Sequence, residues 1–207
     1  MGMLKERKSK KNLLIIIGSL FIFTGITIIL YPLINNKYID IKEEKAIKEY
    51  YIEEVNITEE SHESEIEEVK PKKEINYIGI LKIPKINLER GLVDRNSYSN
   101  NVNYNIQILS NSSMPDEKNG NVILAAHSGN GRTAFFKNID KLVINDEVII
   151  DYKNKTYKYK IIDIYDIEKT GKAKIIRNNN VNTLTLVTCR HNTNNQIIVI
   201  CELKEVM

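Results

Sequence analysis

The sequence is poor in cysteine, in net charge and in internal repetition. Only two cysteines, Cys189 and Cys201, occur in 207 residues, so at most one intrachain disulfide could form. The formal net charge is only +3, and basic residues are not interleaved with aromatic ones, which argues against nucleic-acid binding. With 42% hydrophobic residues the chain is not mostly disordered, and its length allows about one ordinary domain plus additional segments.

Residues 13–34 form an apolar run without a charged side chain. A run of this length can cross the roughly 30 Å hydrocarbon core of a bilayer as a helix. The basic cluster at residues 5–11 precedes it, which predicts a cytoplasmic segment 1–12 and an extracellular remainder. The competing interpretation, a cleaved signal peptide, requires a shorter apolar core and a small-x-small site, which residues 30–35 do not offer. We therefore expect an uncleaved, single-pass anchor in the cell membrane.

Residues 35–74 are rich in Glu and Lys, with isolated Ile, Tyr and Val. Adjacent pairs of glutamates recur along this segment. We expect a solvated stalk, helical in its first half, that holds a domain away from the membrane. His62 lies among these acids, and a lone histidine in a linker is expected to be inert. The folded domain is then expected to occupy residues 75–207.

This domain is predicted to be mostly β. Its short runs are rich in Ile, Val, Tyr and Thr and are separated by Asn, Asp, Gly and Lys turns; they lie at residues 78–83, 102–109, 121–126, 147–152, 157–166, 183–188 and 196–203. Helical spacing is convincing only at residues 133–142, where Phe135, Phe136, Ile139 and Leu142 would share one face. Many short strands with few helices favour a β-barrel or a sandwich of about 130 residues.

Two of the expected strands end on residues that could carry chemistry. Residues 185–189 read Thr-Leu-Val-Thr-Cys and end on Cys189, and the apolar run 121–126 is followed by His127. A cysteine becomes a good nucleophile when a nearby base or cation favours its thiolate, and a histidine can then protonate a leaving amine. If the fold brings the two together, they predict acyl transfer through a thioester. Cys201 lies in a buried-strand run and is expected to be structural, and a disulfide would consume the nucleophile, so we expect both thiols to be free.

Four features in the same order resemble the sortases, the membrane-anchored cysteine transpeptidases of mainly Gram-positive bacteria. They are Gly-Ile-Leu-Lys-Ile-Pro-Lys-Ile at residues 79–86, Gly-Asn-Val-Ile-Leu-Ala-Ala-His-Ser at residues 120–128, the apolar side chains of Phe135, Phe136 and Leu142 after it, and the Thr-Leu-Val-Thr-Cys segment that ends on Cys189. The resemblance covers roughly residues 77–203. The anchor and stalk match the usual layout, which is similar to that of classes B, D and E.

The resemblance implies an eight-stranded sortase-type β-barrel with one or two short helices, preceded by a transmembrane helix and a charged stalk. The family's cysteine attacks the Thr–Gly bond of a Leu-Pro-x-Thr-Gly-like sorting signal, and an amine then resolves the acyl-enzyme. Cys189 would be the nucleophile and His127 the general acid/base, with the loop residue His191 as the only rival base. The implied partners are secreted proteins with C-terminal sorting signals and a peptidoglycan precursor or another amine acceptor. No cofactor and no metal are expected.

One feature departs from the family pattern. Sortases usually carry an arginine at the start of the last strand, where it faces the substrate carbonyl and steadies the oxyanion, but residues 195–199 contain none. Gln196 is the nearest positional equivalent, or Asn195 if the register differs by one. A glutamine amide can donate a hydrogen bond to an oxyanion, although without the charge or bidentate reach of arginine. Arg190 and Arg132 are alternative candidates for this role.

The missing arginine leaves two alternatives to an active transpeptidase. One is a catalytically weak sortase-like domain that binds sorting signals or serves as a scaffold, and the other is a hydrolytic cysteine protease in which water alone resolves the thioester. Residues 165–177 correspond to the variable connection that often forms one wall of the family's sorting-signal groove, and its Lys169, Lys172 and Lys174 are expected to be solubilising. Neither the N-terminal lid nor the C-terminal membrane helix of pilus-building members is visible, which favours a cell-wall anchoring or specialised sortase.

Overall fold

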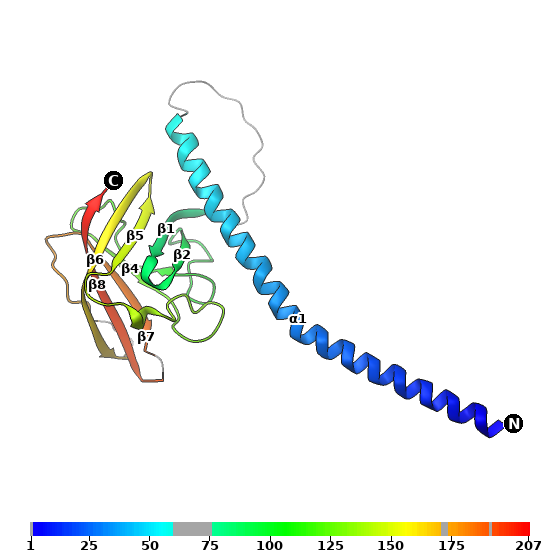
Figure 1. Ribbon diagram of the computed structural model, residues 1–207. Coiled ribbons are helices and arrows are strands. Elements are labelled where there is room, and N and C mark those ends of the chain that lie inside the picture. Colours follow the sequence, from blue (N-terminus) through cyan, green and yellow to red (C-terminus); the bar gives the residue numbers. More distant parts are fainter. Residues whose placement is uncertain (1, 60–75, 171–173, 191) are drawn as a thin grey trace. The chain divides into compact units, whose positions relative to one another are not determined.

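The computed structural model describes residues 2–59, 76–170, 174–190 and 192–207 (Figure 1). The chain divides into two compact units, residues 1–44 and residues 45–207. His62, Lys172, His191 and the second half of the expected stalk lie outside the described residues.

The first unit is the part of helix α1 (Gly2–Glu59) that ends at Glu44. The rest of this helix, from Lys45, belongs to the second unit. Within the described residues, the part Ile16–Glu54 includes a stretch long and apolar enough to cross a membrane. Its large side chains face outward, and Phe21, Phe23 and Ile28 are 70–73% exposed. The serine and threonine hydroxyls in this stretch bond to carbonyls of the same helix, which satisfies polar groups that lipid could not; they belong to Ser19, Thr24 and Thr27. This surface fits a lipid environment better than water.

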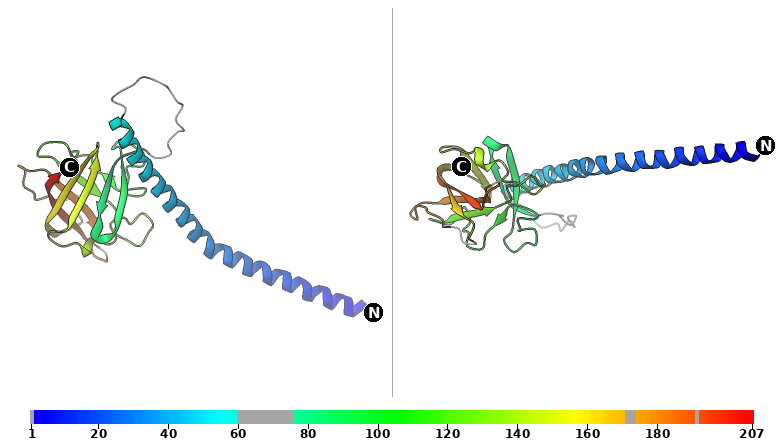
Figure 2. Two further views of the ribbon diagram at one scale, coloured as in Figure 1. Left: turned by 45° about the horizontal axis from the view of Figure 1, so that its top comes forward. Right: turned by 90° about the horizontal axis from the view of Figure 1, so that it is seen from below.

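The second unit is a nearly closed barrel built from one eight-stranded sheet (Figure 2). Its strands are β1 (Tyr77–Ile83), β2 (Leu88–Val93), β3 (Gln107–Ile108), β4 (Asn121–Ala125), β5 (Glu147–Tyr152), β6 (Lys155–Glu168), β7 (Thr183–Cys189) and β8 (Asn195–Val206). Two short 3₁₀ helices, η1 (Pro84–Ile86) and η2 (Ile139–Lys141), complete it. The strand order is β2-β1-β5-β6-β8-β7-β4-β3, and among these described strands β4–β7 is the one parallel pair. The expected eight-stranded barrel is therefore confirmed.

Asparagine side chains connect the two edge strands of the sheet. Asn105, just before β3, donates to the carbonyl of Gly91 on β2 at 2.8 Å and accepts from Arg90 Nε at 3.1 Å. Asn100 bonds to both backbone groups of Ile108, as a neighbouring strand would. Because both asparagines are buried, these bonds satisfy backbone groups that an open edge would leave without partners.

The barrel interior is filled by alternate residues of the strands. On β4 and β7 the inward residues are Val122, Leu124, Leu184 and Leu186, all members of the main hydrophobic cluster. Cys201 on β8 belongs to the same cluster and is fully buried, and burial raises the pKa of its thiol. Both cysteines are free, as predicted, and Cys201 is a core residue.

Strand β2 is not predicted by the sequence, because Glu89, Arg90 and Gly91 interrupt its apolar pattern. It is an edge strand, whose residues alternate less strictly than those of the central strands. Gly91 is required here by close packing, since a Cβ atom at this position would lie 2.4 Å from ring carbons of Tyr77 on β1. The strand expected at residues 102–109 is likewise reduced to the two residues of β3.

The helix predicted at residues 133–142 is replaced by a series of turns that ends in η2. Phe136, Ile139 and Leu142 are buried, as the apolar spacing suggested. The N–H of Phe136 bonds to the carbonyl of His127 at 3.0 Å, and the next bonds span three residues rather than four. The attachment to the end of β4 therefore prevents a regular α-helix.

The end of α1 packs on the outer side of the barrel within the second unit. Ala46 and Tyr50 form a hydrophobic cluster with Tyr77, Ile80 and Val93 of β1 and β2. The sequence predicted a solvated stalk here because glutamates separate the apolar residues, but one face of the helix collects enough of them to bury.

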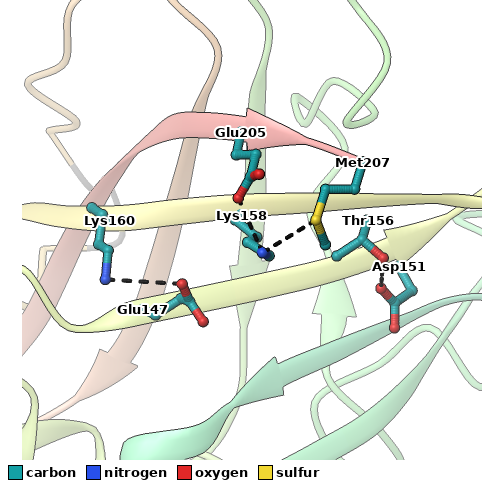
Figure 3. Close-up of polar contacts among 7 residues, drawn as sticks. All are labelled: Glu147, Asp151, Thr156, Lys158, Lys160, Glu205 and Met207. Carbon is teal, nitrogen blue, oxygen red and sulfur yellow. Dashed lines mark hydrogen bonds and ion pairs between the residues drawn. The ribbon is translucent and has the colours of Figure 1, made fainter.

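Polar contacts extend this attachment to β5. Tyr51 Oη donates to Asp151 Oδ2 at 2.7 Å, and Lys82 Nζ on β1 lies 2.7 Å from the same oxygen. Asp151 Oδ1 accepts from Thr156 on β6 at 2.7 Å (Figure 3). Glu54 accepts a hydrogen bond from the backbone N–H of Asn154 at 2.8 Å. Part of the expected stalk is therefore fixed to the barrel.

Candidate active site

The parallel pairing of β4 and β7 brings together the ends of the two strands that precede His127 and carry Cys189. Ala125 pairs with Val187, and each candidate residue follows its strand partner by two positions. Residues two apart on a strand lie on the same face. A hydrophobic cluster on the outer face of the sheet contains Ile123, Val187, Ile198 and Ile200, and Ala125 packs against it. By the same alternation, Cys189 and His127 would continue this outer face at the carboxyl ends of β7 and β4.

Three hydrogen bonds fix the backbone around this pair. Thr188 Oγ1 donates to the carbonyl of Ala126 at 2.7 Å, and the Ser128 hydroxyl donates to the carbonyl of Cys189. The carbonyl of His127 accepts from Phe136. Thr188 is buried, and its hydroxyl is used in its bond to the backbone carbonyl of Ala126.

The two chemical groups are accessible to a substrate. Cys189 is partly exposed and His127 is exposed, whereas Cys201 is sealed in the core. His127 Nε2 lies 3.3 Å from Asn103 Oδ1, in the segment before β3. Asn103 can therefore orient the imidazole, with its oxygen accepting from an Nε2–H. Sequence reasoning missed Asn103, which lies in an asparagine-rich loop where nothing distinguishes it from its neighbours.

Gln196 lies directly opposite Cys189 on β8. Paired residues on antiparallel strands share a face, so Gln196 is on the outer face with Cys189. The next residue, Ile197, belongs to the interior cluster, which fixes the alternation. Asn195 precedes Gln196 and lies on the opposite face. The strand register thus selects Gln196 over Asn195 as the residue beside the thiol.

The arginines are placed differently. Arg190 forms a two-pronged contact with Asp166 on β6, at 2.6 Å from Nε and 2.7 Å from Nη2. This hydrogen-bonded contact raises the pKa of Arg190 above its usual range. Arg132 is exposed in the segment that follows His127. Among the described residues, no group of three or more His, Cys, Asp or Glu side chains could hold a metal ion.

The arrangement contains the kinds of group that covalent acyl transfer requires. A partly exposed thiol, an adjacent imidazole and a side-chain amide on one open face provide a nucleophile, a proton carrier and a hydrogen-bond donor. The outer surfaces of β4 and β7 lead away from this group as an apolar floor that includes Ile123 and Val187.

Comparisons with known proteins identify the same segment. A family model described as the sortase domain matches residues 81–204, more than half of the chain. No curated protein matches. The chain resembles a solved sortase A lid mutant from Corynebacterium diphtheriae at a TM-score of 0.57 and 18% identity, covering 65% of this chain and 73% of the other.

Two further solved structures are similar. A Clostridium perfringens sortase D5 transpeptidase matches at a TM-score of 0.56 and 24% identity, covering 79% of this chain and 96% of the other. Sortase C1 from Streptococcus agalactiae matches at a TM-score of 0.55 and 24% identity, covering 67% of this chain and 72% of the other. These structural likenesses show the fold, and the family match extends over almost the entire barrel. The chain therefore belongs to the sortase family.

Proposed function

We propose that the protein is an active cysteine transpeptidase that cleaves a Leu-Pro-x-Thr-Gly-like sorting signal. It would transfer the cleaved protein to an amine of the cell wall. The main support is the parallel β4–β7 register, because His127 and Cys189 each follow its last pair, Ala125 and Val187, by two residues. The sortase match covers both residues.

In the first half-reaction, the Cys189 thiolate attacks the carbonyl carbon of the Thr–Gly bond. A C–S bond forms, the C–N bond breaks, and His127 gives its proton to the departing amine. The products are a thioester on Cys189 and a free glycine amino group. In the second half-reaction an acceptor amine attacks the thioester, its proton passes to His127, and the thiolate leaves.

Gln196 is the proposed donor to the oxyanion of both tetrahedral intermediates. Its strand partner is Cys189, and its amide is on the same face of the sheet. Arg190 is the weaker candidate, because its guanidinium is already engaged by Asp166. A neutral amide supplies a hydrogen bond where the family usually supplies a charge.

The proposed location follows from the N-terminal segment. Residues 13–34 would span the cell membrane, residues 1–12 would be cytoplasmic, and the stalk 35–74 and the barrel 75–207 would be extracellular. There the barrel would meet secreted proteins with C-terminal sorting signals, and a peptidoglycan precursor or another amine would serve as acceptor. No nucleic-acid partner is proposed.

The full chain in neutral-detergent micelles is the material for the test, because part of α1 packs on the barrel. Fluorogenic sorting peptides are incubated with and without an amine acceptor. We expect a ligation product that depends on the amine and disappears in Cys189→Ala. Cleavage without ligation would indicate a hydrolytic protease. Binding without turnover would favour the scaffold, which the missing arginine allows.

A further inference from the structure

An open cavity lined by both polar and apolar side chains lies on the outer face of the sheet, away from Cys189. Its volume is about 560 Å³. Asn121 and Ile123 of β4 form its base, and residues 174–179 of the connection between β6 and β7 form a wall. Lys174 and Arg177 are both in that wall, and none of the lining side chains is acidic.

The wall is held in place from two sides. On one side, the Tyr165 hydroxyl of β6 donates to the carbonyl of Lys174 and accepts from the N–H of Ile176, both at 2.9 Å. On the other side, Arg177 donates to the carbonyl of Asn119 at 3.1 Å and to Thr183 Oγ1 at 3.2 Å. The cavity is therefore largely preformed, which lowers the entropic cost of binding.

The two cations lack acidic partners in the described part of the chain. Arg177 bonds there only to neutral oxygens, and neither Arg177 nor Lys174 forms an ion pair with a described carboxylate. Two such cations beside a concave, partly enclosed surface produce a positive potential that attracts an anionic group.

The position of the cavity along the strands fixes what could reach it. Asn121 and Ile123 pair with Thr183 and Thr185, which precede Cys189 by six and four residues. At about 3.3 Å per strand residue, the cavity lies about 13–20 Å from the thiol along β7. Consider an extended peptide that lies along β7 with its scissile bond at Cys189. The fourth to sixth residues before that bond would then lie beside the cavity. In a Leu-Pro-x-Thr-Gly signal these are the leucine and the two residues that precede it.

We propose that this cavity binds an acidic side chain immediately before the leucine of the sorting signal. Lys174 and Arg177 would be the specificity-determining cations. The inference rests on the proposed function, because it takes a sorting signal as the occupant of this face. Ile123, at the end of the cavity nearer Cys189, and Val187, between the cavity and the thiol, would receive the leucine and the proline. Lys174 would then recognise the substrate, whereas the sequence predicted a solubilising role for it.

The test compares three peptides that carry Asp, Asn or Lys before Leu-Pro-x-Thr-Gly. Binding to the full-length Cys189→Ala variant in neutral detergent is measured by fluorescence anisotropy, and kcat/KM is measured with the unmodified chain. We expect the Asp peptide to bind about two- to fivefold more tightly than the Asn peptide, as exposed charge pairs do, and the Lys peptide to bind most weakly.

Charge reversal at the cavity provides the second arm. In a Cys189→Ala background, Lys174→Glu should remove the preference for Asp and improve binding of the Lys peptide. Lys169→Glu is the matched control, because Lys169 is an exposed lysine of the same connection that does not line the cavity. The control should retain the preference for Asp.

The outcomes separate this inference from the proposed function. Turnover of all three peptides at equal kcat/KM, with equal binding, overturns the acidic-residue inference and leaves the transpeptidase proposal intact. A charge preference in binding without any turnover supports the inference and contradicts the transpeptidase. If Lys169→Glu changes the preference as much as Lys174→Glu, the effect is a general surface charge and the cavity is not its source.

Discussion

Cys189, Gln196 and His127 are each flanked by residues that point to the other side of the sheet. Thr188 is buried and bonded to backbone, and Ile197 lies in the barrel interior. A shift of one residue in strand register would exchange these roles. The sequence could not decide between Gln196 and Asn195, because both are amides at the start of the same strand. The register pairs Gln196, and not Asn195, with Cys189, which supports the role proposed for Gln196.

We expect Gln196→Ala to lower kcat/KM about 100-fold, as removal of one oxyanion donor does in other acyl-transfer enzymes. Asn195→Ala is the control. It removes a similar amide on the opposite face but keeps the backbone bond between the Asn195 carbonyl and the N–H of Arg190. The kinetics of peptide cleavage should change only a few-fold in the control. Equal losses in the two variants would remove Gln196 from the proposed mechanism.

The two thiols should react very differently with an alkylating reagent. Cys189 is partly exposed, whereas Cys201 is fully buried and its pKa is raised by that burial. The thiolate is the reactive form, so iodoacetamide at neutral pH should label Cys189 alone in the native chain. Mass spectrometry of proteolytic fragments locates the label. Labelling of Cys201 should require denaturant, and its rapid labelling without denaturant would show that the barrel interior opens.

At the scale of elements, the sequence predicts the central strands well and the edges poorly. The strand predicted at residues 147–152 coincides with β5, because the segment is rich in Val, Ile and Tyr and turns bound it. β2 contains Glu89, Arg90 and Gly91, whose environment is set by Tyr77 and Asn105 from other segments. Likewise, only the fold reveals that His127 holds the segment expected to be helical. Non-local contacts decide these elements, and a pattern within one segment does not contain them.

Gly91→Ala should destabilise the barrel by about 1–3 kcal/mol, the usual range for overpacking a close contact. The new methyl group would lie 2.4 Å from ring carbons of Tyr77, which is itself buried. Urea unfolding followed by tyrosine circular dichroism measures the change. Gly129→Ala is the control, since a Cβ atom there meets nothing within 4 Å, and it should alter the free energy of unfolding by less than about 0.5 kcal/mol. Similar values for both variants would refute the packing argument.

At the scale of the whole second unit, the end of α1 is joined to the barrel by an apolar cluster and by one buried carboxylate. Asp151 is 6% exposed and accepts from three side chains, those of Lys82, Tyr51 and Thr156. These groups come from β1, α1 and β6, so a single carboxylate links three elements to β5. Tyr51, from the segment expected to be a solvated stalk, thus takes part in the attachment.

Asp151→Asn should therefore loosen the end of α1, with a loss of about 1.5–3 kcal/mol, as expected for hydrogen bonds to a charged group. Hydrogen exchange of the described helix residues 45–59 measures the loosening, and thermal unfolding measures the total loss. Glu205→Gln is the control, because the ion pair of Glu205 with Lys158 at 3.0 Å is exposed (Figure 3). An exposed pair contributes about 0–1 kcal/mol. Faster exchange in the Glu205→Gln variant would show that the effect is not specific to Asp151.

The same carboxylate predicts how the attachment depends on pH. Burial alone would raise the pKa of Asp151, but hydrogen bonds from Lys82, Tyr51 and Thr156 outweigh burial and lower it. A carboxyl whose pKa is lower in the folded state stabilises that state above its unfolded pKa of about 3.9. Its contribution is lost as the pH falls through the lowered folded value. The stability difference between the unmodified chain and Asp151→Asn should be constant from pH 7 to about pH 5 and should shrink below about pH 4. A difference that stays unchanged down to pH 2 would mean that Asp151 acts through its shape rather than its charge.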